Sequence, residues 1–204
     1  MYVRTIYATG DPARLDEVAD ALRTEGRELL SAQPGFRGMG LFVDREVGKL
    51  LVGSWWEDEA SRQASDESLR ERRAEMLSPF ATTATVDNWQ AAVARRREDL
   101  GPGAGFRLVR MDVAPADVDL LVTAFRETAL PRVEAMPGFK GISLLVDRDH
   151  GRAAVGGLFA DRASLAASRS PVAAVRGETT AKARVTTRSL EEFDTLLATA
   201  VPHV

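Results

Sequence analysis

Apolar residues recur in two rhythms along the first half of the chain. A short run rich in β-branched and apolar side chains, Val3–Thr9, predicts a strand. Apolar residues then return at helical spacing, from Leu15 through Val18 to Leu22, and predict an amphipathic helix. Pro12 stands where the first helical turn would begin, a position that needs no backbone N–H. The chain is therefore expected to start with a strand and a helix.

Two further strands, a second helix and a last strand complete this half. Asp44–Gly48 suits a hairpin loop, because Gly48 can take a positive φ, and Asp58 is a candidate N-cap for the second helix. The order β-α-β-β-α-β is that of the ferredoxin-like unit. The expected bounds are about Phe36–Val43 and Lys49–Trp56 for the middle strands, Asp58–Leu77 for the helix and Ala81–Val93 for the last strand.

The second half of the chain repeats the first. Pro34–Gly38 recurs as Pro137–Gly141, an offset of 137 − 34 = 103 positions. At this offset 23 of the 63 positions from Arg4 to Asp66 are identical without a gap, which indicates a duplication. A period of this length is that of a whole domain and exceeds the repeat lengths of solenoid proteins.

The second copy is expected to contain the same elements. Its second helix should be shorter than that of the first copy, because Pro171 interrupts it. The domains are therefore residues 1–93 for the first repeat, 94–105 for a linker, and 106–204 for a second repeat that ends in a C-terminal helix. The expected bounds are Phe106–Val113, Phe139–Val146, Arg152–Phe159 and Thr179–Ser189 for the strands, and Leu190–Ala200 for the terminal helix.

The predicted strands are apolar on both faces. Along Lys49–Trp56, Leu50 and Val52 alternate with Leu51 and Trp55. The two helices of a ferredoxin-like unit cover one face of its sheet, so the other face needs cover as well. The expected fold class is α+β: two ferredoxin-like β-α-β-β-α-β repeats packed as an intramolecular pseudo-dimeric α/β barrel. The alternative, two units on a flexible string, would expose a large apolar patch on each.

Composition excludes several classes of function. With 27 Lys and Arg against 30 Asp and Glu, the net charge is −3, and there is no clustered basic excess for binding nucleic acid. The absence of cysteine excludes disulfides, thiol nucleophiles and cysteine-ligated zinc. No apolar run approaches the roughly 18 residues of a membrane span, and the first residues lack a signal-peptide pattern. We expect no nucleic-acid or membrane partner and a cytoplasmic location.

The two histidines are poor candidates for a site. His150 falls in the predicted second hairpin loop, and His203 is the penultimate residue, in a segment prone to fraying. A catalytic base or a metal ligand must be held rigidly near its target. No group of His, Asp and Glu has metal-ligand spacing, so we expect no metal site.

The sequence resembles the antibiotic biosynthesis monooxygenase (ABM) family of the dimeric α/β-barrel superfamily. The residues that carry the resemblance are Pro34-Gly35-Phe36 followed by Trp55-Trp56-Glu57-Asp58, and Pro137-Gly138-Phe139 followed by Phe159-Ala160-Asp161. The family includes cofactor-free oxygenases of polyketide quinols and anthrones as well as haem-degrading oxygenases. The resemblance implies a ligand pocket in each unit, between the helices and the sheet.

The polar residues of the characterised activities are absent at the matching places. Haem-degrading members use an Asn on the first strand, and a Trp and a His on the second helix, whereas the first strand here offers Thr5 and the helix offers Ser65. Cofactor-free oxygenases favour an Asn/Trp pair, and the one Asn of this chain is Asn88. Either activity would need a different set of residues, and the catalytic residues stay unknown at this point.

Aromatic side chains of the first copy are the candidate ligand contacts. Trp55 and Trp56 are adjacent on a strand and so point to opposite faces, and core packing is the alternative interpretation of both. The first copy is expected to hold the better aromatic pocket. Arg4 and Arg107 repeat on the first strands as ion-pair partners or as pocket cations. The predicted substrate-binding residues are Tyr7, Trp55, Trp56, Arg73 and Trp89.

The predicted function is binding of a small planar aromatic metabolite, with cofactor-independent monooxygenation as the reaction if the protein is an enzyme. No cofactor is expected, because such a reaction would pass electrons from the substrate directly to O₂ inside a pocket that excludes water. A non-catalytic ligand-binding or stress-related module is the alternative, and a haem protein is a third hypothesis. The expected state is a monomeric pseudo-dimer or a weak homo-oligomer.

Overall fold

The computed structural model describes residues 1–96 and 98–204, and the chain divides into two compact units. Unit 1 consists of Met1–Trp89, Asp99–Pro102 and Asp194–Val201. Unit 2 consists of Gln90–Glu98, Gly103–Phe193 and Pro202–Val204. Each unit therefore contains most of one repeat and a short strand segment from the other.

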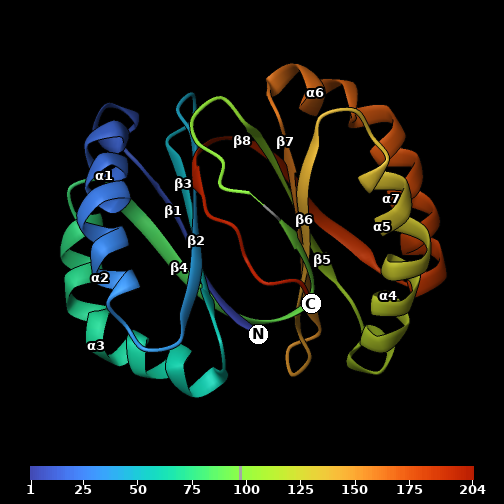
Figure 1. Ribbon diagram of the computed structural model, residues 1–204, viewed down its shortest axis with the longest axis horizontal. Coiled ribbons are helices and arrows are strands. Elements are labelled where there is room, and N and C mark those ends of the chain that lie inside the picture. The colour runs from blue at the N-terminus through green and yellow to red at the C-terminus, as the bar shows by residue number, and fades with distance from the viewer. Residues whose placement is uncertain (97) are drawn as a thin grey trace. The chain divides into compact units, whose positions relative to one another are not determined.

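Unit 1 follows the predicted order, and its helices lie on one face of its sheet (Figure 1). Pro12 opens the first helical turn, and the Asp58 side chain accepts a hydrogen bond from the Ser61 N–H at 2.7 Å, as an N-cap does. The elements are β1 (Tyr2–Gly10), a 3₁₀ turn (Pro12–Arg14), α1 (Leu15–Ala21), a π-helical turn (Leu22–Gly26), α2 (Arg27–Ser31), β2 (Phe36–Asp44), β3 (Lys49–Trp56), α3 (Glu59–Leu77) and β4 (Ala81–Arg96).

Unit 2 repeats this order with a divided second helix. The helix breaks at Ser168, between α6 and α7. The break places Pro171 in the first turn of α7, where a residue without a backbone N–H is tolerated. The elements are β5 (Gly105–Asp112), a 3₁₀ turn (Pro115–Asp117), α4 (Val118–Ala124), a π-helical turn (Phe125–Ala129), α5 (Leu130–Glu134), β6 (Phe139–Asp147), β7 (Arg152–Phe159), α6 (Arg162–Ala167), α7 (Arg169–Ala183) and β8 (Thr186–Ala198).

The two sheets exchange strands. β4 begins beside β1 in unit 1, and its later residues, Gln90–Arg96, pair with β6 in unit 2. β8 begins beside β5, and its residues Asp194–Ala198 pair with β2 in unit 1. The hydrogen-bonded order β1-β3-β2-β8-β5-β7-β6-β4 closes on itself as an antiparallel barrel, which confirms the predicted fold class.

Three boundaries differ from the predictions. The expected C-terminal helix at Leu190–Ala200 is wrong, because residues 190–198 belong to β8. Its apolar residues are spaced as on a helix, but the free edge of β2 supplies ladder hydrogen bonds that decide the conformation. The strand expected from Thr179 begins at Thr186, since α7 continues to Ala183. The expectation that the second helix of unit 2 is shorter than that of unit 1 is therefore also wrong. The proposed linker at 94–105 starts within β4, which extends to Arg96.

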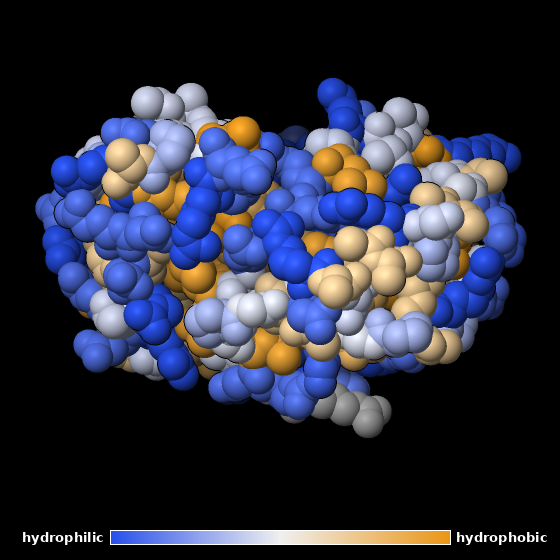
Figure 2. Space-filling view, turned by 90° about the horizontal axis from the view of Figure 1, so that it is seen from above, coloured by the Kyte–Doolittle hydropathy of each residue, from blue (hydrophilic) through white to orange (hydrophobic). Residues whose placement is uncertain are grey.

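A layer of apolar side chains lies between helices and sheet in each unit. In unit 1 it includes Leu15, Val18 and Leu41, and in unit 2 it includes Val118, Leu121 and Leu144, all almost completely buried. Hydrophilic side chains separate the apolar groups on the face shown in Figure 2. No helix in the part of the chain that the structure describes is long and apolar enough to cross a membrane. The cytoplasmic location and the oligomeric state stay predictions.

Candidate functional site

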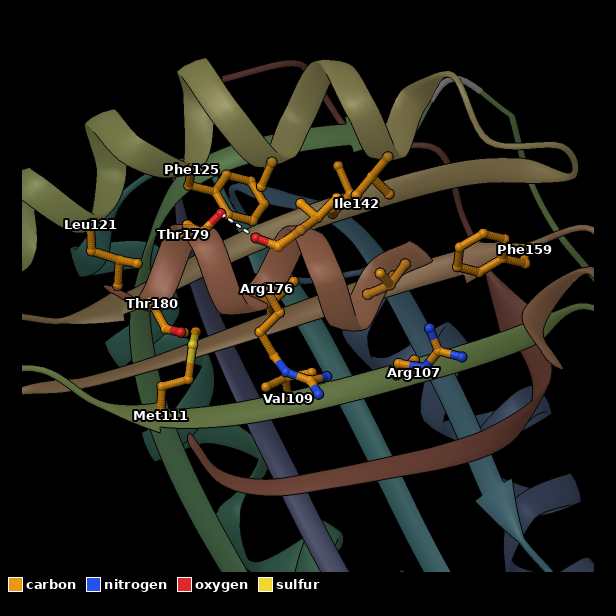
Figure 3. A pocket seen from close by; sticks show the side chains of 16 residues that line it. Arg107, Val109, Met111, Leu121, Phe125, Ile142, Phe159, Arg176, Thr179 and Thr180 are labelled. Carbon is orange, nitrogen blue, oxygen red and sulfur yellow. Dashed lines mark hydrogen bonds between the residues drawn. The ribbon is translucent and has the colours of Figure 1, made fainter. Parts of the chain in front are cut away.

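An apolar cavity of about 70 Å³ lies between the helices and the sheet of unit 2 (Figure 3). Aliphatic and aromatic side chains form most of its wall, and polar atoms come from two arginines and two threonines. β5, β6 and β7 contribute Arg107, Val109, Met111, Ile142, Val155, Gly157 and Phe159, and the helices contribute Leu121, Phe125, Ala129, Val133, Val172, Val175, Arg176, Thr179 and Thr180.

Unit 1 contains a smaller cavity, of about 50 Å³, at the equivalent place. The same offset of 103 relates the two linings: Arg4 corresponds to Arg107, and Arg73 to Arg176. Where Arg72 lines the unit 1 cavity, Val175 lines that of unit 2, so the second cavity is also the more apolar. The pocket expected in each repeat is present.

A π-helical turn borders each cavity. The turns Leu22–Gly26 and Phe125–Ala129 occupy the same place in the two repeats, and both contribute side chains to the lining. Such turns interrupt α-helices frequently at functional sites. Their repetition beside both cavities indicates that the local widening of the helix belongs to the architecture of the cavity.

In unit 2 an ion-pair network that contains the buried Arg107 adjoins the cavity. Arg107 donates to Glu192 Oε1 at 2.7 Å, to the Leu165 carbonyl at 2.8 Å and to Ser168 Oγ at 3.0 Å. Arg169 donates to Glu192 Oε2 at 2.6 Å. Partial burial tends to raise the pKa of Glu192, but hydrogen bonds from Arg169 and Arg107 outweigh burial and lower it. Glu192 is therefore a carboxylate whose two oxygens are already engaged.

Arg176 has a different environment. Figure 3 shows its side chain running from α7 across the cavity toward Val109. It forms no hydrogen bond or ion pair with any residue in the ranges 1–96 and 98–204. The neighbouring hydroxyl groups are occupied, because Thr179 donates to the Val175 carbonyl and Thr180 to that of Gly177. The guanidinium of Arg176 is thus a free donor at an apolar cavity.

In unit 1 the equivalent arginine is neutralised. Arg73 donates to Asp66 Oδ1 at 2.7 Å, and the same carboxylate accepts from Arg4 at 3.4 Å and from Arg70 at 3.2 Å. Burial raises the pKa of Asp66, but the hydrogen bond from Arg73 and the charges of the three arginines lower it more. Burial is the main cause that lowers the pKa of Arg4 to about 10, so Arg4 remains protonated at neutral pH.

The sequence-predicted contacts are distributed over both faces of the unit 1 sheet. Arg73 lines the cavity. Trp56 is fully buried with its ring edge against Phe36 and the Arg4 guanidinium 5.4 Å from its centroid, and its Nε1 donates to Ser54 Oγ at 3.0 Å. Trp56 does not line the cavity.

Tyr7, Trp55 and Trp89 point to the other face of that sheet. Tyr7 and Trp55 each follow a cavity residue, Ile6 and Ser54, and successive strand residues face opposite ways. Trp89 Nε1 donates to Thr5 Oγ1 at 2.8 Å on that same face. The structure therefore does not bring the five residues together around one cavity, and their role in binding stays a prediction.

The second-copy residues around Arg176 were not among the residues predicted from the sequence. The first copy was expected to hold the better pocket, yet the larger cavity lies in unit 2 and receives Phe125 and Phe159. At the offset of 103, Arg169 stands opposite Asp66, and the same offset pairs Arg73 with Arg176 beyond the 63 compared positions. The unpaired state of Arg176 depends on packing and has no sequence signal.

The lining does not suit a haem ligand. His150 lies in an exposed loop beside Asp147, and His203 is exposed near the C-terminus. None of the residues described around the two cavities is a histidine or a tyrosine. Among the described residues, no group of three or more His, Asp and Glu could hold a metal ion.

Two ferredoxin-like units, each with an apolar cavity between its helices and its sheet, define a tandem member of the dimeric α/β-barrel class. The chain belongs to the antibiotic biosynthesis monooxygenase family, whose sequence profile matches residues 1–95. It is 31% identical to the uncharacterized protein Rv2557 of Mycobacterium tuberculosis over 156 residues, which cover 75% of this chain and 68% of that protein.

Solved structures agree on the fold. A candidate monooxygenase from Lactobacillus acidophilus superposes with a TM-score of 0.75 at 14% identity, covering 100% of this chain and 98% of that one. An anthrone oxidase-like protein superposes with a TM-score of 0.67 at 13% identity, covering 99% of this chain and 92% of that one. At these identities the likeness establishes the architecture, and the reaction has to be argued from the cavity.

Proposed function

We propose that the protein binds a small planar aromatic molecule in the cavity of unit 2 and oxygenates it with O₂, without a metal or a flavin. The observation that carries this proposal is the apolar cavity between helices and sheet, with Phe125 and Phe159 in its wall. Apolar pockets with a few convergent polar groups are the usual sites for such ligands. Membership of the monooxygenase family supports the type of reaction.

The proposed reaction needs no external reductant. A methylene group activated by an adjacent phenol or carbonyl loses a proton, and the resulting carbanion passes electrons to O₂. One oxygen atom remains in the product as a carbonyl, and the other leaves as water with the two hydrogens of the methylene group. The apolar wall shields the radical pair from water, and the Arg176 guanidinium lowers the free energy of the substrate anion.

Oxygen uptake with a tricyclic anthrone tests the proposal. Val155 lines the cavity of unit 2 and is partly exposed, so Val155→Phe fills the cavity from β7. We expect uptake well above the spontaneous rate for the unsubstituted protein and a return to that rate for Val155→Phe. Val52→Phe, at the equivalent place in unit 1, is the matched control and should retain activity. Circular dichroism verifies that both variants are folded.

The unit 1 residues predicted from the sequence remain a competing site for the reaction. If Trp56→Ala or Tyr7→Phe abolished uptake while Val155→Phe did not, the reaction would belong to unit 1 and the proposal for unit 2 would fail. The two outcomes separate cleanly, because no residue of that set lines the unit 2 cavity.

A second candidate function is ligand binding without catalysis. It is favoured by one observation: none of the described lining residues of the unit 2 cavity is a carboxylate or an imidazole that could act as a general base. Uptake equal to buffer for every electron-rich aromatic tested, together with saturable binding of the same compounds, would support this candidate over the oxygenase.

A further inference from the structure

One cavity arginine has different partners in the two repeats. Arg73 and Arg176 are related by the offset of 103 and line equivalent cavities. Arg73 is paired with Asp66 on its own helix. The position equivalent to Asp66 is Arg169, so the charge that neutralises Arg73 is reversed in unit 2. This single exchange leaves Arg176 without its counter-ion.

Glu192 does not replace the missing carboxylate. It comes from β8, and its two oxygens accept from Arg107 and Arg169. These three side chains, with Arg176 and the exposed Leu190, line an open depression that adjoins the cavity. The lining of this depression therefore contains three guanidinium groups and one carboxylate. The neighbouring carboxylates Glu191 and Glu178 are already paired, with Arg110 and Arg132, so they do not neutralise the positive charge of Arg176.

We propose that unit 2 selects amphipathic anions: the apolar body of the ligand enters the cavity, and a carboxylate on it pairs with Arg176. In unit 1, Asp66 occupies the place of that anion, so the equivalent cavity does not bind such ligands. The inference deepens the proposed function, because it uses the same cavity and names the charge of the molecule that fills it. It does not depend on oxygenation.

Before a ligand binds, the Arg176 guanidinium has no ion pair within the described part of the chain to give up. A carboxylate gains charge-assisted hydrogen bonds from a guanidinium that breaks no internal ion pair to make them. The planar fork of an arginine suits a carboxylate in particular. At Arg73 the same ligand would have to displace Asp66 from a 2.7 Å hydrogen bond. The free energy gained from the new hydrogen bonds would then be offset by the loss of the bond to Asp66.

Binding of 2-naphthoate and of methyl 2-naphthoate to the full chain, measured by isothermal titration calorimetry, tests the inference. The two probes share an aromatic body and differ in charge. We expect one naphthoate per chain, bound at least about tenfold more tightly than the ester, which corresponds to a hydrogen bond between charged groups. Arg176→Gln should abolish the preference, so that naphthoate binds no more tightly than the ester, and Arg176→Lys should retain part of it.

Matched variants locate the effect. Arg73→Gln, the equivalent change in unit 1, should leave both affinities unchanged. Arg169→Asp restores the unit 1 arrangement in unit 2 and should abolish the preference for the anion, although Arg176 itself is intact. Raising the salt concentration should weaken binding of naphthoate and leave the ester unaffected.

Three outcomes would overturn the inference: equal affinities of the unsubstituted protein for the two probes, a preference that survives Arg176→Gln, or no binding of either probe. In the last case the proposed binding site fails as well. Tight, Arg176-dependent binding of naphthoate with no oxygen uptake from any substrate would refute the oxygenase alone and uphold the anion site.

Discussion

At the scale of single residues, Arg4 and Arg107 show what the repeat preserves. The sequence left open whether this repeated arginine is an ion-pair partner or a pocket cation. Arg4 donates to the carbonyl of Arg62 at 3.4 Å, and Arg107 to that of Leu165 at 2.8 Å, and these two acceptors are also related by the offset of 103. Both arginines are almost fully buried and tie the first strand to the second helix. Their first role is therefore structural.

Asp66, whose carboxylate pairs with Arg4 and Arg73 in unit 1, should contribute to the stability of the folded protein. Replacing Asp66 with Asn leaves the buried Arg4 without a charged partner, and we expect a loss of about 1–2 kcal/mol in the free energy of unfolding at pH 7. The measurement is urea unfolding, with Asp20→Asn, which removes an exposed pair with Arg23, as a control that changes little.

The effect of Asp66 should depend on pH in a definite direction. Its pKa in the folded state is depressed, so its contribution is complete above the unfolded-state pKa of about 4. It is lost as the pH falls through the lower folded-state pKa. The difference between the unsubstituted protein and Asp66→Asn should be constant from pH 7 to pH 5 and narrow below about pH 4. A difference that grew on acidification would contradict this assignment.

At the scale of elements, the sequence correctly predicted the features that depend on neighbouring residues, such as helix starts and hairpin turns. Pro12 at the first helical turn, the N-cap Asp58 and both hairpins are where the sequence placed them. Two features escaped prediction because their causes are not local. The π-helical turns have no pattern of their own within an amphipathic helix, and β8 is decided by a strand edge far away in the sequence.

The second half of β8 should protect β2 in unit 1. Truncation after Phe193 removes Asp194–Ala198, and we expect faster hydrogen exchange of the β2 amides around Gly40–Val43, because they lose their ladder partner. Truncation after Val201 is the matched control, since it leaves that ladder in place. Exchange in β2 that is identical in both truncated forms would show that β8 does not stabilise unit 1.

At the scale of the whole molecule, the duplication and the two-faced apolar strands were enough to predict the closed barrel. The exchange of strand segments was not predictable, because both repeats offer the same apolar pattern to β4 and β8, and hydrogen-bond register decides between the two sheets. The partners are equivalent: Asp194 pairs with Val43, and Gln90 pairs with Val146, which lies 103 positions after Val43.

This equivalence predicts the behaviour of the isolated first repeat. In a fragment of residues 1–96, β2 lacks β8, and Gln90–Arg96 lacks β6. Because each copy carries the strand that the other lacks, we expect the fragment to form a dimer by strand exchange, with an unfolding temperature that rises with concentration. Sedimentation equilibrium measures the mass. A fragment of residues 1–89 should not dimerise, and a folded monomer of residues 1–96 would refute the prediction.

Because the two repeats are fused in one chain, their two cavities can differ. In a homodimer one stretch of gene encodes both sites, so every substitution is inherited twice and a harmful change strikes both halves at once. In a fused chain, separate stretches of the gene encode the two sites. The two copies can therefore carry opposite charges at one position, Asp66 in the first and Arg169 in the second, so that one half keeps a neutralised arginine while the other leaves it free.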